Sequence, residues 1–320
     1  LYTGWEWPPG TCPDYRTSFK KYSKEFVTES TDTVKEPNQP HHGKLYKPIW
    51  EECQKLLTTV DTSSAAQASM CRHPHLLPAF YHTLEYLQEL QSDDVSSSDT
   101  PPPVTLVFRT FGTDIQDVAQ WVTEYAKEQH CSWLEIGPNQ LFQGRWKELG
   151  GKDSAGKPLV TYQLWDLAET RVLAQNEDEI LKLFNSGTIF GVRDDYNYWK
   201  KCHWLPTAGK PVWIPSTPST SSMDGETEEI FCHHLLFDDN IHNLPDDGIA
   251  CIRQQRQQSI GMDTEFTSVP TDVMHSDEYQ GIHLKRVPTI EPVLNPKWYI
   301  EQIELSRLLL EEKLKKSNLR

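Results

Sequence analysis

Four residues that could act together on a phosphoryl group lie next to apolar runs of the sequence. Thr110 ends the run "VTLVFRT", Lys210 begins "KPVWI", and Asp238 and Asp239 follow "HHLLF". A hydroxyl and an ammonium group can hold phosphoryl oxygens, while paired carboxylates suit Mg²⁺, which prefers oxygen ligands. The sequence therefore predicts a phosphate site at Thr110 and Lys210 and a magnesium site at Asp238 and Asp239.

Short, nearly continuous apolar strands would have to position these residues. The candidate strands are 104–108, 188–192, 210–214, 233–237 and 249–253. Such runs favour a parallel α/β sheet covered on both faces over an antiparallel sandwich. Ligands of open α/β sheets bind at the carboxyl ends of the strands. We therefore expect Thr110, Asp238 and Asp239 to converge at one edge of a Rossmann-like parallel sheet flanked by helices.

Helices are expected on either side of the first strand. The segment "LLPAFYHTLEYLQEL" repeats apolar residues at three- and four-residue spacing, which is typical of an amphipathic helix. A second helix follows Asp114, whose carboxylate would suit the exposed amides at a helix start. Its apolar face consists of Ile115, Val118, Ala119, Val122 and Ala126.

A long helix is expected at the C-terminus. Asn295 and Pro296 make a suitable cap and first turn for it. Its apolar stripe should pack against the domain, because the stripe needs an apolar neighbour. The apolar pattern includes Ile300, Ile303, Leu308 and Leu310, and the side expected to pack on the domain comprises Ile300, Ile303 and Leu310. The residues left in solvent or facing an acidic partner are Lys313, Lys315 and Lys316.

The chain divides into two parts of different composition. Residues 1–75 are rich in Pro, Trp, Tyr and Lys and are predicted to form an irregular wrapping extension. Residues 76–320 are predicted to form one α/β domain. Two Ser/Pro-rich insertions, near 91–103 and 215–229, are expected to be surface loops of that domain.

The order of these motifs resembles the haloacid dehalogenase-like hydrolase superfamily, over about residues 104–255. Its second motif is a strand ending in Thr or Ser, matched by "LVFRT" with Thr110. Its third motif supplies a lysine, matched by Lys210, and its fourth ends in adjacent acids, matched by Asp238 and Asp239 in "LLFDD". "FRTFGTD" and "FDDN" are similar to a eukaryotic branch. The resemblance implies Mg²⁺-dependent hydrolysis of a phosphorylated small molecule.

The first motif of that superfamily is missing. It is a strand ending in Asp-x-Asp, which carries the covalent nucleophile and the acid/base, and no Asp-x-Asp occurs in the 320 residues. Asp61 in "LLTTVDTSS" is the nearest imitation, but it lacks the second carboxylate. Either the nucleophile strand lies upstream of Leu1 in a longer natural chain, or the protein keeps the fold without the chemistry.

Each candidate residue also has an ordinary structural interpretation. Thr110 can end a strand and bond a loop amide, Lys210 can be a surface lysine, and "FDDN" can be an acidic turn. Two adjacent acids after an apolar strand nevertheless repel each other and need a compensating partner. In "RDDY", either acid could enter the same crevice, or Arg193 could merely offset Asp194 and Asp195. "CRHPH" places Cys71, His73 and His75 close together, but zinc would need a second ligand cluster.

Composition limits the partners. With 46 acidic residues against 31 Lys and Arg, the net charge of −15 argues against nucleic acid and anionic membranes. No apolar run approaches the roughly 18 residues of a membrane span. Seven unpatterned cysteines suggest a reducing compartment, so a cytoplasmic location is expected.

A rival interpretation is a non-catalytic scaffold within a larger intracellular assembly. Aromatic residues beside prolines in the first 75 residues, such as Trp5, Trp7 and Tyr15, would then bury against protein partners.

Overall fold

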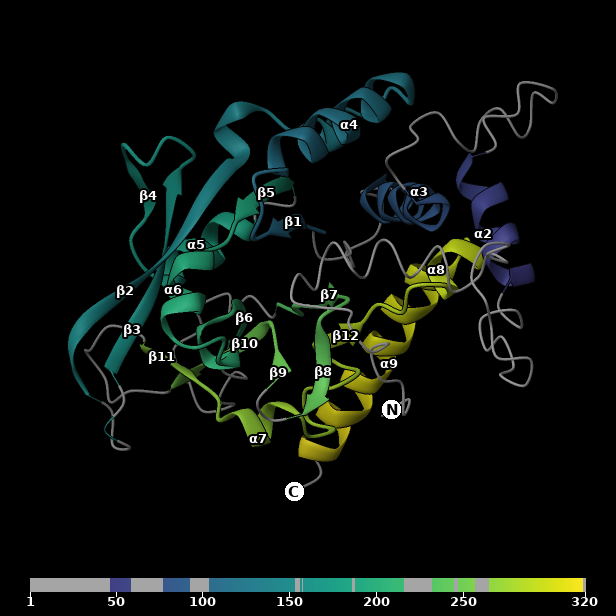
Figure 1. The fold of residues 1–320 in the computed structure, drawn as a ribbon. Coiled ribbons are helices and arrows are strands. Elements are labelled where there is room, and N and C mark those ends of the chain that lie inside the picture. Colours follow the sequence, from purple (N-terminus) through teal and green to yellow (C-terminus); the bar gives the residue numbers. More distant parts are fainter. Residues whose placement is uncertain are drawn as a thin grey trace, which may run out of the picture.

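The computed structural model describes residues 47–58, 77–92, 104–152, 156, 158–185, 188–215, 232–244, 247–256 and 265–318 (Figure 1). Within the predicted extension 1–75, the described part is helix α2 (Lys47–Thr58). The predictions for Asp61, for the Cys71, His73 and His75 group, and for most of the two Ser/Pro-rich insertions lie outside the described residues.

The largest sheet of the described chain is mixed, with the strand order β1-β5-β2-β3-β4. Its strands are β1 (Leu106–Thr110), β5 (Ile189–Arg193), β2 (Leu141–Lys152), β3 (Pro158–Asp166) and β4 (Val172–Ala174). β1, β5 and β2 run parallel, whereas β2, β3 and β4 are antiparallel neighbours. The expected parallel arrangement therefore holds for one half of the sheet and is wrong for the other.

The remaining expected strands lie in smaller sheets rather than in one. One sheet contains β11 (Glu265–Ser268), β10 (Ala250–Arg256) and β6 (Lys210–Ile214), in which β6 and β10 are parallel. The other two are the parallel pair β7 (Leu236–Asp238) with β12 (Leu284–Arg286) and the antiparallel pair β8 (Ile241–Leu244) with β9 (Asp247–Gly248). Five strands predicted for a single sheet are thus divided among three.

β7 begins three residues later than the sequence pattern predicts. The two histidines at the start of the predicted strand are held by another segment instead. The Nε2 atom of His233 lies 2.8 Å from the carbonyl oxygen of Ile282, and Nδ1 of His283 donates to the carbonyl of His234 at 2.9 Å. These bonds replace a regular ladder before Leu236.

Helices cover both faces of the large sheet. Ile189 of β5 packs in one cluster with the residues of α4 (Ile115–Glu128), and its neighbour Phe190 packs in another with those of α5 (Glu177–Phe184). Because successive residues of a strand point to opposite faces, α4 and α5 lie on opposite sides of the sheet. The predicted helix after Leu76 is α3 (Pro78–Ser92), which packs on α4 through the rings of Tyr81 and Tyr125, 5.0 Å apart.

The described chain also contains shorter helices. They are α6 (Tyr196–Lys201), α7 (Thr271–Met274), α8 (Glu291–Leu294) and the 3-10 turns η2 (Ser132–Leu134), η3 (Pro138–Gln140) and η4 (Pro206–Ala208).

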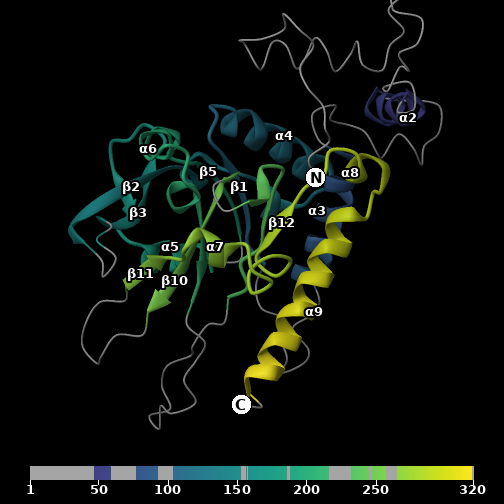
Figure 2. The same ribbon diagram turned by 60° about the horizontal axis from the view of Figure 1, so that its bottom comes forward.

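The predicted C-terminal helix is α9 (Trp298–Asn318), which lies on the side of the molecule opposite the β2–β3 hairpin (Figures 1 and 2). The side chain of Asn295 accepts a hydrogen bond from the amide of Lys297 at 3.0 Å, just before the helix starts. On the side expected to pack, Leu310 is buried and Ile300 and Ile303 are half-buried. Within the described ranges, none of the helices combines the length and apolar character that a bilayer-spanning segment requires.

The basic residues at the end of α9 differ in their surroundings. Lys315 and Lys316 are exposed, as expected. Lys313 instead lies over the ring of Tyr279, 5.6 Å from its centroid, and its ammonium is 3.3 Å from a carboxylate oxygen of Glu278. One of the three lysines therefore helps to hold α9 on the domain.

Candidate functional site

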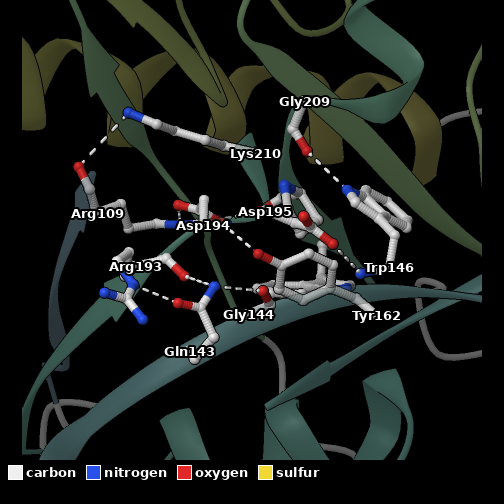
Figure 3. Close-up of polar contacts among 12 residues, drawn as sticks. Arg109, Gln143, Gly144, Trp146, Tyr162, Arg193, Asp194, Asp195, Gly209 and Lys210 are labelled. Carbon is white, nitrogen blue, oxygen red and sulfur yellow. Dashed lines mark hydrogen bonds and ion pairs between the residues drawn. The ribbon is translucent and has the colours of Figure 1, made fainter. Parts of the chain in front are cut away.

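Lys210, the first residue of β6, forms a buried ion pair with Asp238, the last residue of β7. Its Nζ lies 2.7 Å from Oδ2 of Asp238, and the two side chains are 7% and 8% exposed. The same ammonium is 3.5 Å from the carbonyl oxygen of Arg109 in β1 (Figure 3). One cation therefore joins the carboxyl ends of β1 and β7, although these strands belong to different sheets.

Thr110 lies beside this centre, but its hydroxyl is used by its own loop. The hydroxyl accepts a hydrogen bond from the amide of Gly112 and donates one to Oδ1 of Asp114, both at 2.9 Å. The Asp114 carboxylate was expected to bind the exposed amides at the start of α4. It makes no such bond and accepts the Thr110 hydroxyl instead. The hydroxyl would have to release Asp114 before it could donate to a phosphate.

Asp238 and Asp239 face different surroundings. Asp238 binds Lys210 with one oxygen and the amide of Asn240 with the other, at 2.9 Å. Asp239 is exposed and accepts a bond from the side-chain amide of Asn240. Across the described part of the chain, no group of three or more His, Cys, Asp or Glu side chains is placed to hold a metal. Asp238 is therefore engaged by Lys210 and Asn240, while Asp239 faces solvent.

A second polar centre surrounds Asp194 of "RDDY", with partners that the sequence did not predict (Figure 3). Asp194 follows β5 and is 2% exposed. Its carboxylate accepts hydrogen bonds from both Nε and Nη2 of Arg109, the former at 3.0 Å, and from the hydroxyl of Tyr162 in β3 at 2.5 Å. Arg109 also donates to the carbonyl of Pro211. The network thus ties β1, β3 and β6 to the end of β5.

The hydroxyl of Tyr162 is a permanent donor in this network. Burial, and then the neighbouring charge of Asp194, raise the pKa of the Tyr162 hydroxyl well above its ordinary value. The hydroxyl therefore stays protonated at neutral pH and keeps donating to Asp194. Since each charged group here already has its partner, the arrangement stabilises the strands rather than offering a free nucleophile.

Gly144 of β2 makes room for the Tyr162 ring. A Cβ atom on Gly144 would lie 2.0 Å from the hydroxyl oxygen of Tyr162 and 2.5 Å from Cζ. Gly144→Ala is therefore expected to displace the ring and lower the free energy of unfolding by about 1–3 kcal/mol, as overpacking does. Urea denaturation measures this loss. Gly137→Ala is the control, because its nearest neighbour, Oε1 of Gln140, is 3.3 Å away and can move. Equal losses in both variants would contradict the assignment.

The other acid of "RDDY" has a local structural role. The carboxylate of Asp195 accepts the amide hydrogen of Tyr198, in the first turn of α6, at 3.0 Å and that of Trp146 at 3.1 Å. Arg193 does not pair with either acid but binds Gln143. Asp195 therefore caps a helix, a role that the sequence did not predict, and Asp194 is joined to the Lys210 centre through Arg109.

One signal in the sequence points to the second centre. Arg109 interrupts an otherwise apolar strand, and a buried cation requires a partner nearby. The adjacent acids of "RDD" are candidates for that partner. No comparable signal identifies Tyr162, whose place is set by the pairing of β3 with β2.

Comparisons of this chain with protein-family models, with curated proteins and with solved structures found no match.

Proposed function

We propose that this chain forms most of a haloacid dehalogenase-like, Rossmann-like domain whose phosphotransfer site lacks its nucleophile. The observation that supports this proposal best is the meeting of two strand ends at one buried ammonium. Lys210 touches the end of β1, where Thr110 follows, and the end of β7, where Asp238 lies. A lysine, a hydroxyl and a carboxylate at such a place suit the binding of a phosphoryl group.

The hydrogen bonds of β1 suggest where a missing strand would pair. Among the described strands, β1 pairs with β5 alone and β7 with β12 alone. The carbonyl of Thr110 points toward β5, where it accepts the amide of Asp194 at 2.7 Å, so the carbonyl of Arg109 points to the other side. That side faces Lys210. A further parallel strand on this edge would bring its own carboxyl end beside Lys210 and Asp238.

We assign that strand to a segment upstream of Leu1 that ends in Asp-x-Asp. Its first carboxylate would attack phosphorus and release the alcohol, and water would then hydrolyse the aspartyl-phosphate. Lys210 would hold the phosphoryl oxygens, and Thr110 would donate to one of them after leaving Asp114. Bound Mg²⁺ would shield the negative charge of the phosphate and would need further oxygen ligands beside Asp238 and Asp239.

Restoring the upstream segment tests this proposal. We expect the 320-residue chain to show no Mg²⁺-dependent hydrolysis of an aryl phosphate. A longer chain that carries the natural upstream segment should hydrolyse it. Lys210→Met in the longer chain should lower kcat by on the order of 10²–10³-fold, since it removes a donor to the developing charge. Asp272→Asn, an exposed acid of α7, is the matched control. If the 320-residue chain hydrolyses the aryl phosphate and Asp238→Asn abolishes that hydrolysis, the proposal that the chain lacks its nucleophile is wrong.

A second candidate function is that of a non-catalytic scaffold. It is favoured because the polar groups of the site already have partners within the chain: the Thr110 hydroxyl binds its own loop, and Lys210 neutralises Asp238. An upstream segment without Asp-x-Asp, together with a longer chain that does not hydrolyse phosphate esters, would select this alternative.

A further inference from the structure

Aromatic rings form a continuous series from Lys210 to the molecular surface. The Nζ atom of Lys210 lies 5.4 Å from the ring centroid of Phe111. Phe111 stacks on Trp199 with centroids 4.8 Å apart and planes inclined by 10°, and Trp199 meets Trp204 edge to face at 5.0 Å. Tyr196 contacts all three rings. We call Phe111, Tyr196, Trp199 and Trp204 the aromatic platform.

The outer part of the aromatic platform is open to solvent. Tyr196 is 38% exposed, Trp204 42% and the adjoining Leu205 46%. Single exposed apolar residues are ordinary, but neighbouring ones indicate a binding surface. Phe111 follows β1 directly and Tyr196 lies shortly after the parallel strand β5, so the platform lies at the strand ends where α/β proteins bind ligands.

The backbone that carries Trp204 adopts an unfavourable conformation. His203 and Trp204 have φ angles of 54° and 65°, so two successive residues other than glycine occupy the left-handed region. The turn is closed by a 3.0 Å bond from the amide of Trp204 to the carbonyl of Trp199. Glycine would suit this turn without strain. Strain of this kind gathers at functional sites, and here it sets the Trp204 ring against Trp199 and Tyr196.

We propose that the aromatic platform binds a planar aromatic ring of a phosphorylated ligand. Flat rings stack on tryptophan and tyrosine whatever substituents they carry, and the series of rings ends at the ammonium of Lys210. The ring-binding half of this inference stands on the platform alone, whereas the phosphate half rests on the proposed function. The ligand class is therefore an aryl or heteroaryl phosphate rather than a sugar or alkyl phosphate.

Three probes that differ in one feature each test the inference on the 320-residue chain. Binding of 1-naphthyl phosphate, cyclohexyl phosphate and 1-naphthol is measured by titration calorimetry and by the shifts of indole N–H resonances. We expect 1-naphthyl phosphate to bind roughly ten-fold more tightly than cyclohexyl phosphate, which is within the range of one stacked ring. Trp204→Ala should abolish this preference, and Trp204→Phe, which keeps a ring, should retain part of it.

A variant outside the aromatic platform provides the control. Leu308→Ala removes a 57% exposed leucine of α9, far from the platform in sequence, and should leave the ten-fold preference unchanged. Equal affinity for the naphthyl and cyclohexyl phosphates, or no binding of either, would overturn the aromatic platform. If 1-naphthol binds as tightly as 1-naphthyl phosphate and both depend on Trp204, the platform stands and the phosphate site at Lys210 fails.

Discussion

Replacement of Arg253 by methionine is expected to lower the free energy of unfolding by about 3–5 kcal/mol, because it leaves a buried carboxylate without its cation. Arg253 of β10 is 1% exposed and Glu177 of α5 is 3% exposed. They are joined by two bonds, from Nε to Oε1 at 2.6 Å and from Nη2 to Oε2 at 2.7 Å. The guanidinium also binds the carbonyls of Val160 and Phe266. It therefore links the large sheet to the β11-β10-β6 sheet.

A double-mutant cycle with Glu177→Gln measures this coupling by guanidinium denaturation. The second change removes the unpaired charge but keeps an acceptor for the indole N–H of Trp213, which binds Glu177 at 3.0 Å. The double variant should therefore be more stable than Arg253→Met alone. Additive losses from the two single variants would show that the ion pair contributes no coupling free energy.

The loss in Arg253→Met should also depend on pH. Burial raises the pKa of Glu177, and the charge of Arg253 opposes that rise. Without Arg253 the folded-state pKa rises further above the unfolded value, so the folded protein binds the proton more tightly. The loss of unfolding free energy in Arg253→Met is therefore largest above the folded-state pKa of Glu177, and it shrinks as the pH falls through that pKa.

Deletion of residues 295–320 is expected to lower the melting temperature by about 10–20 °C. Trp298 and Leu310 are buried, and burial of each large apolar side chain contributes roughly 1.5–3 kcal/mol. The deletion also uncovers Phe237, whose ring meets Trp298 and Tyr299. A combined loss of about 5 kcal/mol corresponds to this shift, because 1 kcal/mol changes the melting temperature of 150–250 residues by about 2–4 °C.

A shorter truncation provides the control for this deletion. A chain ending at Leu314 loses the exposed Lys315 and Lys316 but keeps Trp298 and Leu310, so its melting temperature should stay close to that of the full chain. Scanning calorimetry measures both truncations. An unchanged melting temperature after removal of the entire helix would mean that α9 does not stabilise the domain.

Periodicity in the sequence predicted the elements whose burial is one-sided or complete. The helices α3, α4 and α9 and the strands β1, β5, β6 and β10 lie within a few residues of their expected places. The β2–β3 hairpin escaped prediction because polar residues and glycines interrupt the apolar residues of β2 and leave no continuous apolar run. Gln143 and Gln163 are nonetheless buried, since each is hydrogen-bonded. The division of the strands among several sheets was not predicted either, because it depends on contacts between segments that are distant in sequence.

The candidate site was predicted only in part, for a similar reason. The pairing of Lys210 with Asp238 agrees with the expectation that adjacent acids after an apolar strand need a compensating partner. The outward direction of Asp239 and the local bonds of Thr110 depend on turn geometry that residue types do not specify. The part of Tyr162 in the Asp194 network could not be derived from the sequence, because Tyr162 reaches Asp194 through the pairing of β3 with β2.

Arg109 belongs to both polar centres through different parts of the same residue. Its backbone carbonyl receives the Lys210 ammonium, while its guanidinium is held by Asp194 and by the carbonyl of Pro211. The end of β1 therefore cannot slide or rotate toward Lys210 without pulling on the bonds at Asp194. The Lys210 centre and the Asp194 centre are therefore coupled, and Arg109 transmits a displacement at one of them to the other.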